Sequence, residues 1–166
     1  MYNDTFMQRA IAISAQALAT PGTEPFGAVI VKDGKIVGEG LNHSLANFDP
    51  TSHGETEAIR EACRNLKTVD LRGCELYTSC EPCALCVAAM VIAGIGKMYY
   101  AASLSQCGPI FDALPTDERF PIDCDHLTSE CGHSVHERSL PAEQKMSAEA
   151  LDVLKAWAAP RLKEGV

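Results

Sequence analysis

The sequence predicts an α/β protein with a central mixed sheet of about five strands. Two apolar, strand-like runs, residues 28–31 and 35–40, indicate the first pair of strands. They flank Asp33 and Gly34, and an Asp-Gly pair between two such runs is a strong signal for a tight hairpin turn. These two strands are therefore expected to lie side by side and antiparallel.

Helices are expected to alternate with the other strands. Residues 4–18 place apolar side chains among alanines at a spacing that suits a helix packed on a sheet. A second helix is expected to begin near His53, and a third to cover residues 82–93. This third helix separates strand-like runs at 75–78 and 97–103, an order that favours parallel pairing of those two strands.

The chain of 166 residues is expected to form a single domain, residues 1–166, because this length is enough to bury a core and shape a pocket. Residues 105–140 show no regular period, so we expect an irregular segment that covers the pocket. Prolines interrupt it: Pro109, Pro115 and Pro121. Residues 147–163 have the spacing of an amphipathic helix. Its apolar side chains are expected to face inward: Leu151, Leu154 and Trp157.

The chemistry is concentrated in a split motif. His53, Gly54 and Glu55 form one half, and Cys83 and Cys86 follow about thirty residues later. One imidazole and two thiolates make three zinc ligands, which leave the fourth tetrahedral position open for water, as in catalytic zinc sites. Glu55 is then the candidate catalytic residue, because a metal-bound water needs a group that takes its proton. The motif predicts one zinc ion per chain.

The spacing of the ligands fits two helix starts. Cys83 and Cys86 are three residues apart and so share one face of a helix, with Pro82 suited to the first helical position. The positive end of the helix dipole favours thiolates there. His53 follows a run rich in capping residues, so it too is expected near the start of a helix.

The residues alone leave other kinds of site open. A Cys-x-x-Cys pair also occurs in redox proteins, although His53 argues against that assignment. A structural zinc site, in a non-catalytic module, would need a fourth protein ligand, for which Cys80 is the candidate. A second metal site would draw on residues 105–140, which contain Cys124, His126, Cys131 and His133. These lack the Cys-x-x-Cys spacing of zinc knuckles, so we expect a single zinc ion.

The pair of motifs His-x-Glu and Pro-Cys-x-x-Cys marks the zinc deaminases. The chain resembles the cytidine deaminase-like superfamily, and within it most of all the bacterial guanine deaminases. The resemblance is carried by residues 25–34, Asn42, residues 49–51 and residues 76–83, and it runs from about residue 5 to residue 102. It implies a three-layer α/β/α fold and hydrolytic release of ammonia from a free nucleobase or similar small heterocycle.

The chain departs from the usual guanine deaminase pattern inside the motif itself. Gly54 stands where those enzymes usually have alanine, and Ala84 and Leu85 stand where they usually have Pro-Met. His-Gly-Glu is also similar to the motif of fungal cytosine deaminases. The resemblance therefore implies the reaction, while cytosine or a nucleoside stays open as the substrate.

The resemblance also implies residues that bind the base. Phe26 would stack on the ring and Asn42 would hydrogen-bond it, although Phe26 could instead open a buried strand and Asn42 could cap a turn. An acidic residue that helps to read the purine is expected after the fourth strand. The candidates are Asp112, Asp117 and Glu118.

The net charge of the chain indicates which binding partners to expect. With 22 acidic and 14 basic side chains the net charge is −8, which disfavours nucleic acid and hence a tRNA adenosine deaminase. A small heterocyclic amine is compatible with this charge.

No apolar run reaches the roughly 18 residues of a membrane span, so no membrane partner is expected. The eight scattered cysteines favour a reducing, cytoplasmic location. By resemblance, the C-terminal region covers the pocket or docks on a partner subunit, which implies a homodimer.

Overall fold

The computed structural model describes residues 2–115 and 122–162. The helices are α1 (Asp4–Ser14), α2 (Ser44–Asn47), α3 (Gly54–Leu66), α4 (Ala84–Ala93), α5 (Leu104–Asp112), α6 (Cys124–Gly132) and α7 (Ser147–Ala158). Two 3₁₀ turns, η1 (Ala15–Leu18) and η2 (Ala159–Arg161), extend α1 and α7. The strands are β1 (Glu24–Lys32), β2 (Lys35–Asn42), β3 (Cys74–Cys80) and β4 (Lys97–Ala102).

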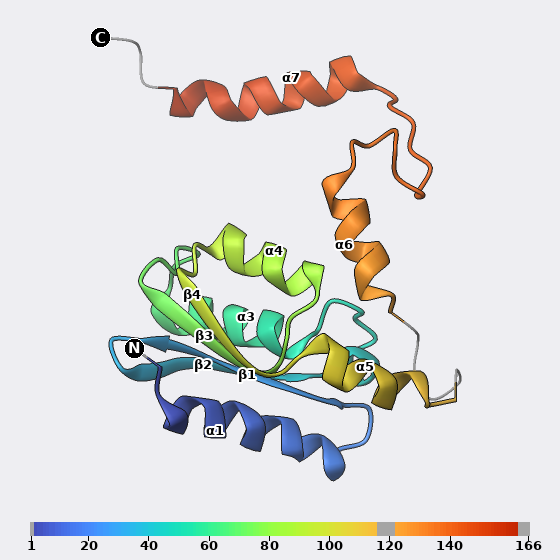
Figure 1. The fold of residues 1–166 in the computed structure, drawn as a ribbon. Coiled ribbons are helices and arrows are strands. Elements are labelled where there is room, and N and C mark those ends of the chain that lie inside the picture. Colours follow the sequence, from blue (N-terminus) through green and yellow to red (C-terminus); the bar gives the residue numbers. More distant parts are fainter. Residues whose placement is uncertain (1, 116–121, 163–166) are drawn as a thin grey trace. The chain divides into compact units, whose positions relative to one another are not determined.

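The strands form one mixed sheet with the order β2-β1-β3-β4 (Figure 1). β1 is antiparallel to both β2 and β3, whereas β3 and β4 run parallel. The predicted hairpin and the predicted parallel pair are confirmed. The expected number of about five strands is slightly wrong, because the described residues contain four. After β4, Ser103 caps α5, so the chain continues as a helix instead of a further strand.

Helices cover both faces of this sheet (Figure 1). On one face α1 packs through Met7, Ala10 and Ile13, and on the other face α3 and α4 form a separate core. Successive residues of β1 alternate between the two cores: Val29 belongs to the α1 side and Ile30 to the side of α3 and α4. This alternation is the two-residue period of a strand buried on both faces. The three-layer α/β/α architecture is thereby confirmed.

Both helices of the split motif begin one residue after a predicted ligand. α3 begins at Gly54 with His53 as its N-cap, and α4 begins at Ala84 with Cys83 as its N-cap. The expected start at Pro82 is wrong by two residues. The backbone of Cys83 is extended, with φ −72° and ψ 170°, as is usual for an N-cap residue, and Pro82 precedes it.

Two helices, α5 and α6, lie within the segment that was expected to be irregular. Pro109 is accommodated inside α5. That helix starts with a capping box, in which the Ser103 side chain accepts from the backbone N–H of Gln106 and the Gln106 side chain accepts from the N–H of Ser103. Ser-x-x-Gln is a sequence signal for a helix start, and the prolines that follow obscured it.

The chain groups into two compact units, Met1–Thr128 and Ser129–Val166, so a single domain over residues 1–166 stays a prediction. The second unit contains α7, which ends at Ala158, earlier than expected. Within this unit the exposed fractions of its apolar side chains are 50%, 61% and 62% for Leu151, Leu154 and Trp157, and their expected inward orientation stays a prediction. Amphipathic spacing indicates a shared face, but it does not indicate what covers that face. In the described residues, no helix has the length and hydropathy to cross a bilayer.

Glycines let α3 approach the sheet closely. A Cβ atom added to Gly40 of β2 would lie under 3.0 Å from the carbonyl oxygen of Gly54 and the amide nitrogen of Ala58, both in α3. A Cβ atom at Gly54 would collide in the same way with the carbonyl oxygen of Phe26. Glycine at position 54 therefore fits this chain, because the backbone of β1 fills the space that an alanine side chain would need.

We predict that Gly40→Ala lowers the free energy of unfolding by about 1–3 kcal/mol, because the added methyl group forces α3 away from β2. Urea denaturation followed by circular dichroism measures the change. Gly96→Ala is the matched control, since a Cβ atom there meets nothing within 4 Å. Equal destabilisation by the two substitutions would contradict the proposed close packing.

Candidate active site

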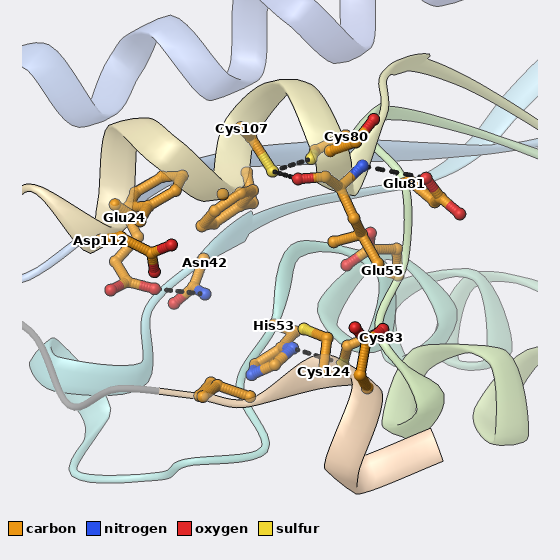
Figure 2. A pocket seen from close by; sticks show the side chains of 17 residues that line it. Glu24, Asn42, His53, Glu55, Cys80, Glu81, Cys83, Cys107, Asp112 and Cys124 are labelled. Carbon is orange, nitrogen blue, oxygen red and sulfur yellow. Dashed lines mark hydrogen bonds between the residues drawn. The ribbon is translucent and has the colours of Figure 1, made fainter. Parts of the chain in front are cut away.

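Three predicted ligands converge where α3 and α4 begin. Nδ1 of His53 lies 3.6 Å from Sγ of Cys83 (Figure 2). It also lies 3.5 Å from Sγ of Cys86, and the two sulfurs are 3.9 Å apart. All the potential ligand atoms lie within 4.8 Å of one another. Within the described ranges this is the group of histidines, cysteines and carboxylates that could hold a metal ion. The cysteines and histidines of residues 122–140 form no second such group there.

The electrostatics of this cluster favour a thiolate. The pKa of Cys83 is lowered to about 4, chiefly because Cys86 donates a hydrogen bond to its sulfur and also because His53 lies beside it. The same contact with Cys83 raises the pKa of His53. The hydrogen bond to Cys83 and burial raise the pKa of Cys86. Two sulfurs and one imidazole nitrogen are a donor set that suits Zn²⁺, so the residues fit the metal that the motif implies.

Glu55 projects beside the cluster and is 5% exposed (Figure 2). Its Oε1 accepts a hydrogen bond of 2.9 Å from the Thr78 hydroxyl, and its Oε2 lies 3.3 Å from Sγ of Cys86. Burial raises the pKa of Glu55 above its ordinary value. A carboxyl group with a raised pKa can both take up and return protons, which is what general acid–base catalysis requires.

Thr78, whose hydroxyl group holds Glu55, is not among the site residues that the motifs predict. Thr78 is fully buried in β3, where its side chain lies on the same face as α3 and α4. Threonine is common in strands, so its type alone carries no functional signal. The available clue is its place near the end of an apolar run, five residues before Cys83.

Cys80 does not belong to the metal cluster. Its Sγ lies 3.3 Å from Sγ of Cys107 in α5, and both residues line the pocket (Figure 2). Burial, together with the contact to Cys107, raises the pKa of Cys80 to about 12. A buried thiol with this pKa is a poor metal ligand, so a four-ligand structural zinc site that includes Cys80 is not assembled here.

The cluster opens into a cavity of about 520 Å³. It is lined by α5, by the ends of β1, β2 and β3, and by the start of α6. Its carboxyl groups come from Glu24, Glu55, Glu81, Asp112 and Asp125. Among the described lining residues there is no lysine or arginine. The carboxyl groups of the described lining can accept hydrogen bonds from a small ligand that carries N–H donors.

The structure brings both predicted base-binding residues into this cavity. Asn42 lies at the end of β2 and is 2% exposed, and Phe26 lies at a bulge of β1, with its ring centroid 5.1 Å from that of Phe111 in α5. Of the acidic candidates, Asp112 lines the cavity (Figure 2). Asp117 and Glu118 lie outside the described residues.

Residues 1–102 match the family described as "Cytidine and deoxycytidylate deaminase zinc-binding region". This stretch contains β1 to β4 and all the residues of the split motif. The chain therefore belongs to this family of zinc-binding deaminases. It is a zinc-dependent hydrolytic deaminase, with His53, Cys83 and Cys86 positioned to bind the ion.

Within this family the chain is similar to guanine deaminases along its whole length. It is 37% identical over 157 residues to the guanine deaminase of Bacillus subtilis (strain 168), which covers 95% of this chain and 94% of that relative. The X-ray structure of guanine deaminase from Bacillus subtilis matches with a TM-score of 0.82 at 34% identity, covering 100% of this chain and 98% of that one. The tRNA-specific adenosine deaminase of Aquifex aeolicus (strain VF5) is 41% identical over 102 residues, or 61% of this chain and 67% of that relative.

We predict that Cys83→Ala reduces the bound zinc from one ion per chain to nearly none, because two ligands hold the ion far more weakly than three. Inductively coupled plasma mass spectrometry of the dialysed protein measures the zinc content. Cys131→Ala, which removes an exposed free cysteine, should keep the full zinc content. A full complement of zinc in the Cys83 variant would show that the ligands are assigned wrongly.

Proposed function

We propose that the protein is a guanine deaminase, which converts the amine-bearing ring carbon of the free base to a carbonyl and releases ammonia. One observation carries the proposal. Similarity to the Bacillus subtilis enzyme covers 95% of this chain and so extends beyond residue 102 into α5, the helix that forms one wall of the cavity. The match to the Aquifex aeolicus tRNA-specific adenosine deaminase spans only 61% of the chain.

The lining of the cavity supports a free base over a nucleotide or a nucleic acid. It combines several carboxyl groups with no lysine or arginine among its described residues, and the whole chain carries a net charge of −8. A phosphate group entering this cavity would be repelled and would find no cationic partner. A purine base has no phosphate and presents N–H groups, which carboxylates accept.

The reaction needs a nucleophile and a proton carrier on the same face of the ring. A zinc ion held by His53, Cys83 and Cys86 would supply a bound water of lowered pKa. We assign the proton transfers to Glu55. Its carboxylate accepts the proton of the attacking water and returns it to a ring nitrogen. It then takes the proton of the newly added hydroxyl group and passes it to the leaving amine, so that ammonia departs and a carbonyl remains. Thr78 holds the carboxyl group in the required place through its hydrogen bond to Oε1.

The remaining cavity residues would hold the ring. Phe26, supported by its contact with Phe111, offers an aromatic face for stacking. Asn42 offers its amide for a hydrogen bond to the base. Asp112, in the last turn of α5, offers a carboxylate to N–H groups of the base and is our choice for the acidic residue that the resemblance implies.

We further propose that the protein is a homodimer. The support is α4, which contains no polar side chain other than Cys86 and yet covers the sheet with only one of its faces. Val87, Val91 and Ile92 on the other face are 40%, 73% and 86% exposed. A helix that is apolar all round is normally buried, and a second copy of this chain is the partner that would bury it.

We also place the enzyme in the cytoplasm, as a step of purine metabolism. All eight cysteines are free thiols, including Cys80 and Cys107, whose sulfurs lie close together. Paired thiols of this kind are kept reduced in the cytosol.

We predict that Glu55→Gln lowers kcat by about 10²–10⁴-fold, because glutamine cannot carry a proton, while zinc stays bound. Ammonia release from guanine and zinc content are measured on the same preparation. Glu57→Gln is the control, since Glu57 lies in the same helix but pairs with Arg60. Wild-type turnover by the Glu55 variant would exclude Glu55 as the proton carrier.

We predict the highest kcat/KM for guanine in a panel that also contains cytosine, adenine, guanosine, guanosine monophosphate and intact tRNA. Turnover of the monophosphate should be lower than that of the nucleoside, because the carboxyl groups of the cavity repel phosphate. Ammonia release with a glutamate dehydrogenase-coupled assay measures each rate. A higher kcat/KM for cytosine, a nucleoside or tRNA would overturn the guanine assignment.

A further inference from the structure

Glu24 and Asn42 face each other across the hairpin and both line the cavity. They are cross-strand partners in the pairing of β1 with β2, the first residue of one strand opposite the last residue of the other. The register then shifts between Glu24 and Gly27, so that Phe26 lies in a β-bulge. A β-bulge changes the direction in which the neighbouring side chains point, and such bulges are frequent next to active sites. This bulge places Glu24, Phe26 and Asn42 on one wall of the cavity.

The amide of Asn42 is fixed at both ends. Its Oδ1 accepts a hydrogen bond of 2.9 Å from the backbone N–H of Ser44, and its Nδ2 donates one of 3.1 Å to Oε2 of Glu24. Since a backbone N–H only donates and a carboxylate only accepts, the flipped amide would lose both bonds. Nδ2 carries two N–H groups, and the bond to Glu24 uses one of them.

We propose that Glu24 is a positioning residue for substrate recognition: its carboxylate locks Asn42 so that the second Nδ2–H points at the ring in the cavity. This proposal rests on the role assigned to Asn42 in the proposed function. Asn42 is 2% exposed, so its amide has little access to water that could replace either partner. Without Glu24, the amide loses the contact that holds its donor end toward the cavity.

The locked amide also selects the substrate. Asn42 then presents an N–H donor and no acceptor, so it pairs with an acceptor on the ring, such as a carbonyl oxygen or an aza nitrogen. A ring that places an amine at that point meets donor against donor and is left with an unpaired polar group, which costs binding. An oxo-purine is therefore preferred over one with an amine at the contacted position.

Glu24 differs in its contacts from Glu55 and Glu81, two other carboxyl groups of the cavity. Oε2 of Glu81 accepts the backbone N–H of Leu104 and so holds the start of α5, whereas Oε1 of Glu55 accepts from Thr78 beside the metal cluster. Figure 2 shows Glu24 and Asn42 together on one side of the cavity and Glu55 and Cys83 on the other. Glu24 is thus placed to affect binding of the ring through Asn42.

A double-mutant cycle with guanine tests this proposal. Glu24→Ala should raise KM about tenfold, the effect of one lost hydrogen bond, with kcat nearly unchanged. In the Asn42→Ala background the same substitution should change KM by less than about twofold, because the residue through which Glu24 acts is already gone. Equal effects of Glu24→Ala in the two backgrounds would overturn the proposal, as would a fall in kcat without a change in KM.

Further variants separate positioning from general destabilisation. Glu24→Gln keeps an oxygen acceptor and should stay within about threefold of the wild-type KM. Glu39→Ala removes a glutamate of β2 that pairs with Arg9 outside the cavity, and it should leave KM unchanged. Zinc content and Tm near wild type establish that each variant is folded. Should Glu24→Ala not fold, Glu24→Thr replaces it, because threonine suits a strand and is too short to reach Nδ2.

The cycle is independent of the guanine assignment. If the wild type does not deaminate guanine, that result counts against the proposed function, and the cycle is run on the base of the panel with the highest kcat/KM. The coupling between Glu24 and Asn42 is measured in either case, and its absence counts against the role of Glu24 alone.

Discussion

The close packing of α3 against β2 is the constraint on which the site depends. It sets the position of His53 and Glu55, because both lie at the first turn of a helix that touches the sheet through Gly40 and Gly54. α4 packs on the same face, and Cys83 caps its start. The metal cluster thus exists because two helices begin side by side at one edge of one sheet. A change in this packing would move ligands that are themselves unaltered.

The cavity has two regions that differ in their charged and polar side chains. At the metal end, a thiolate at Cys83 and a buried carboxyl group at Glu55 serve the binding of a cation and the transfer of protons. At the other end, Glu24 and Asp112 provide acceptors without any neighbouring cation among the described lining residues. The first region accounts for hydrolytic deamination in general. The second supports the proposed preference for a base over a nucleotide, so in this proposal reaction and specificity rest on different residues.

Much of the fold and of the candidate site could be predicted from the sequence, for physical reasons. The Asp33-Gly34 turn and the period of the strands predict the hairpin, and the spacing of the split motif predicts the ligands, because these signals are local. Contacts between distant segments leave no such signal. Glu24 meets Asn42, and Thr78 meets Glu55, only through sheet register and helix packing. The spacing of apolar residues in α7 likewise indicates a shared face and not the partner that would cover it.

Zinc K-edge X-ray absorption spectroscopy of the zinc-loaded protein tests the central claim most directly. Ligation by His53, Cys83 and Cys86 with one open position predicts two sulfur scatterers at about 2.3 Å and two nitrogen or oxygen scatterers at about 2.0–2.1 Å. The second light scatterer would be solvent, as hydrolysis requires. A shell of three or four sulfurs would contradict the account, because it would mean that a further cysteine closes the position where the reaction has to take place.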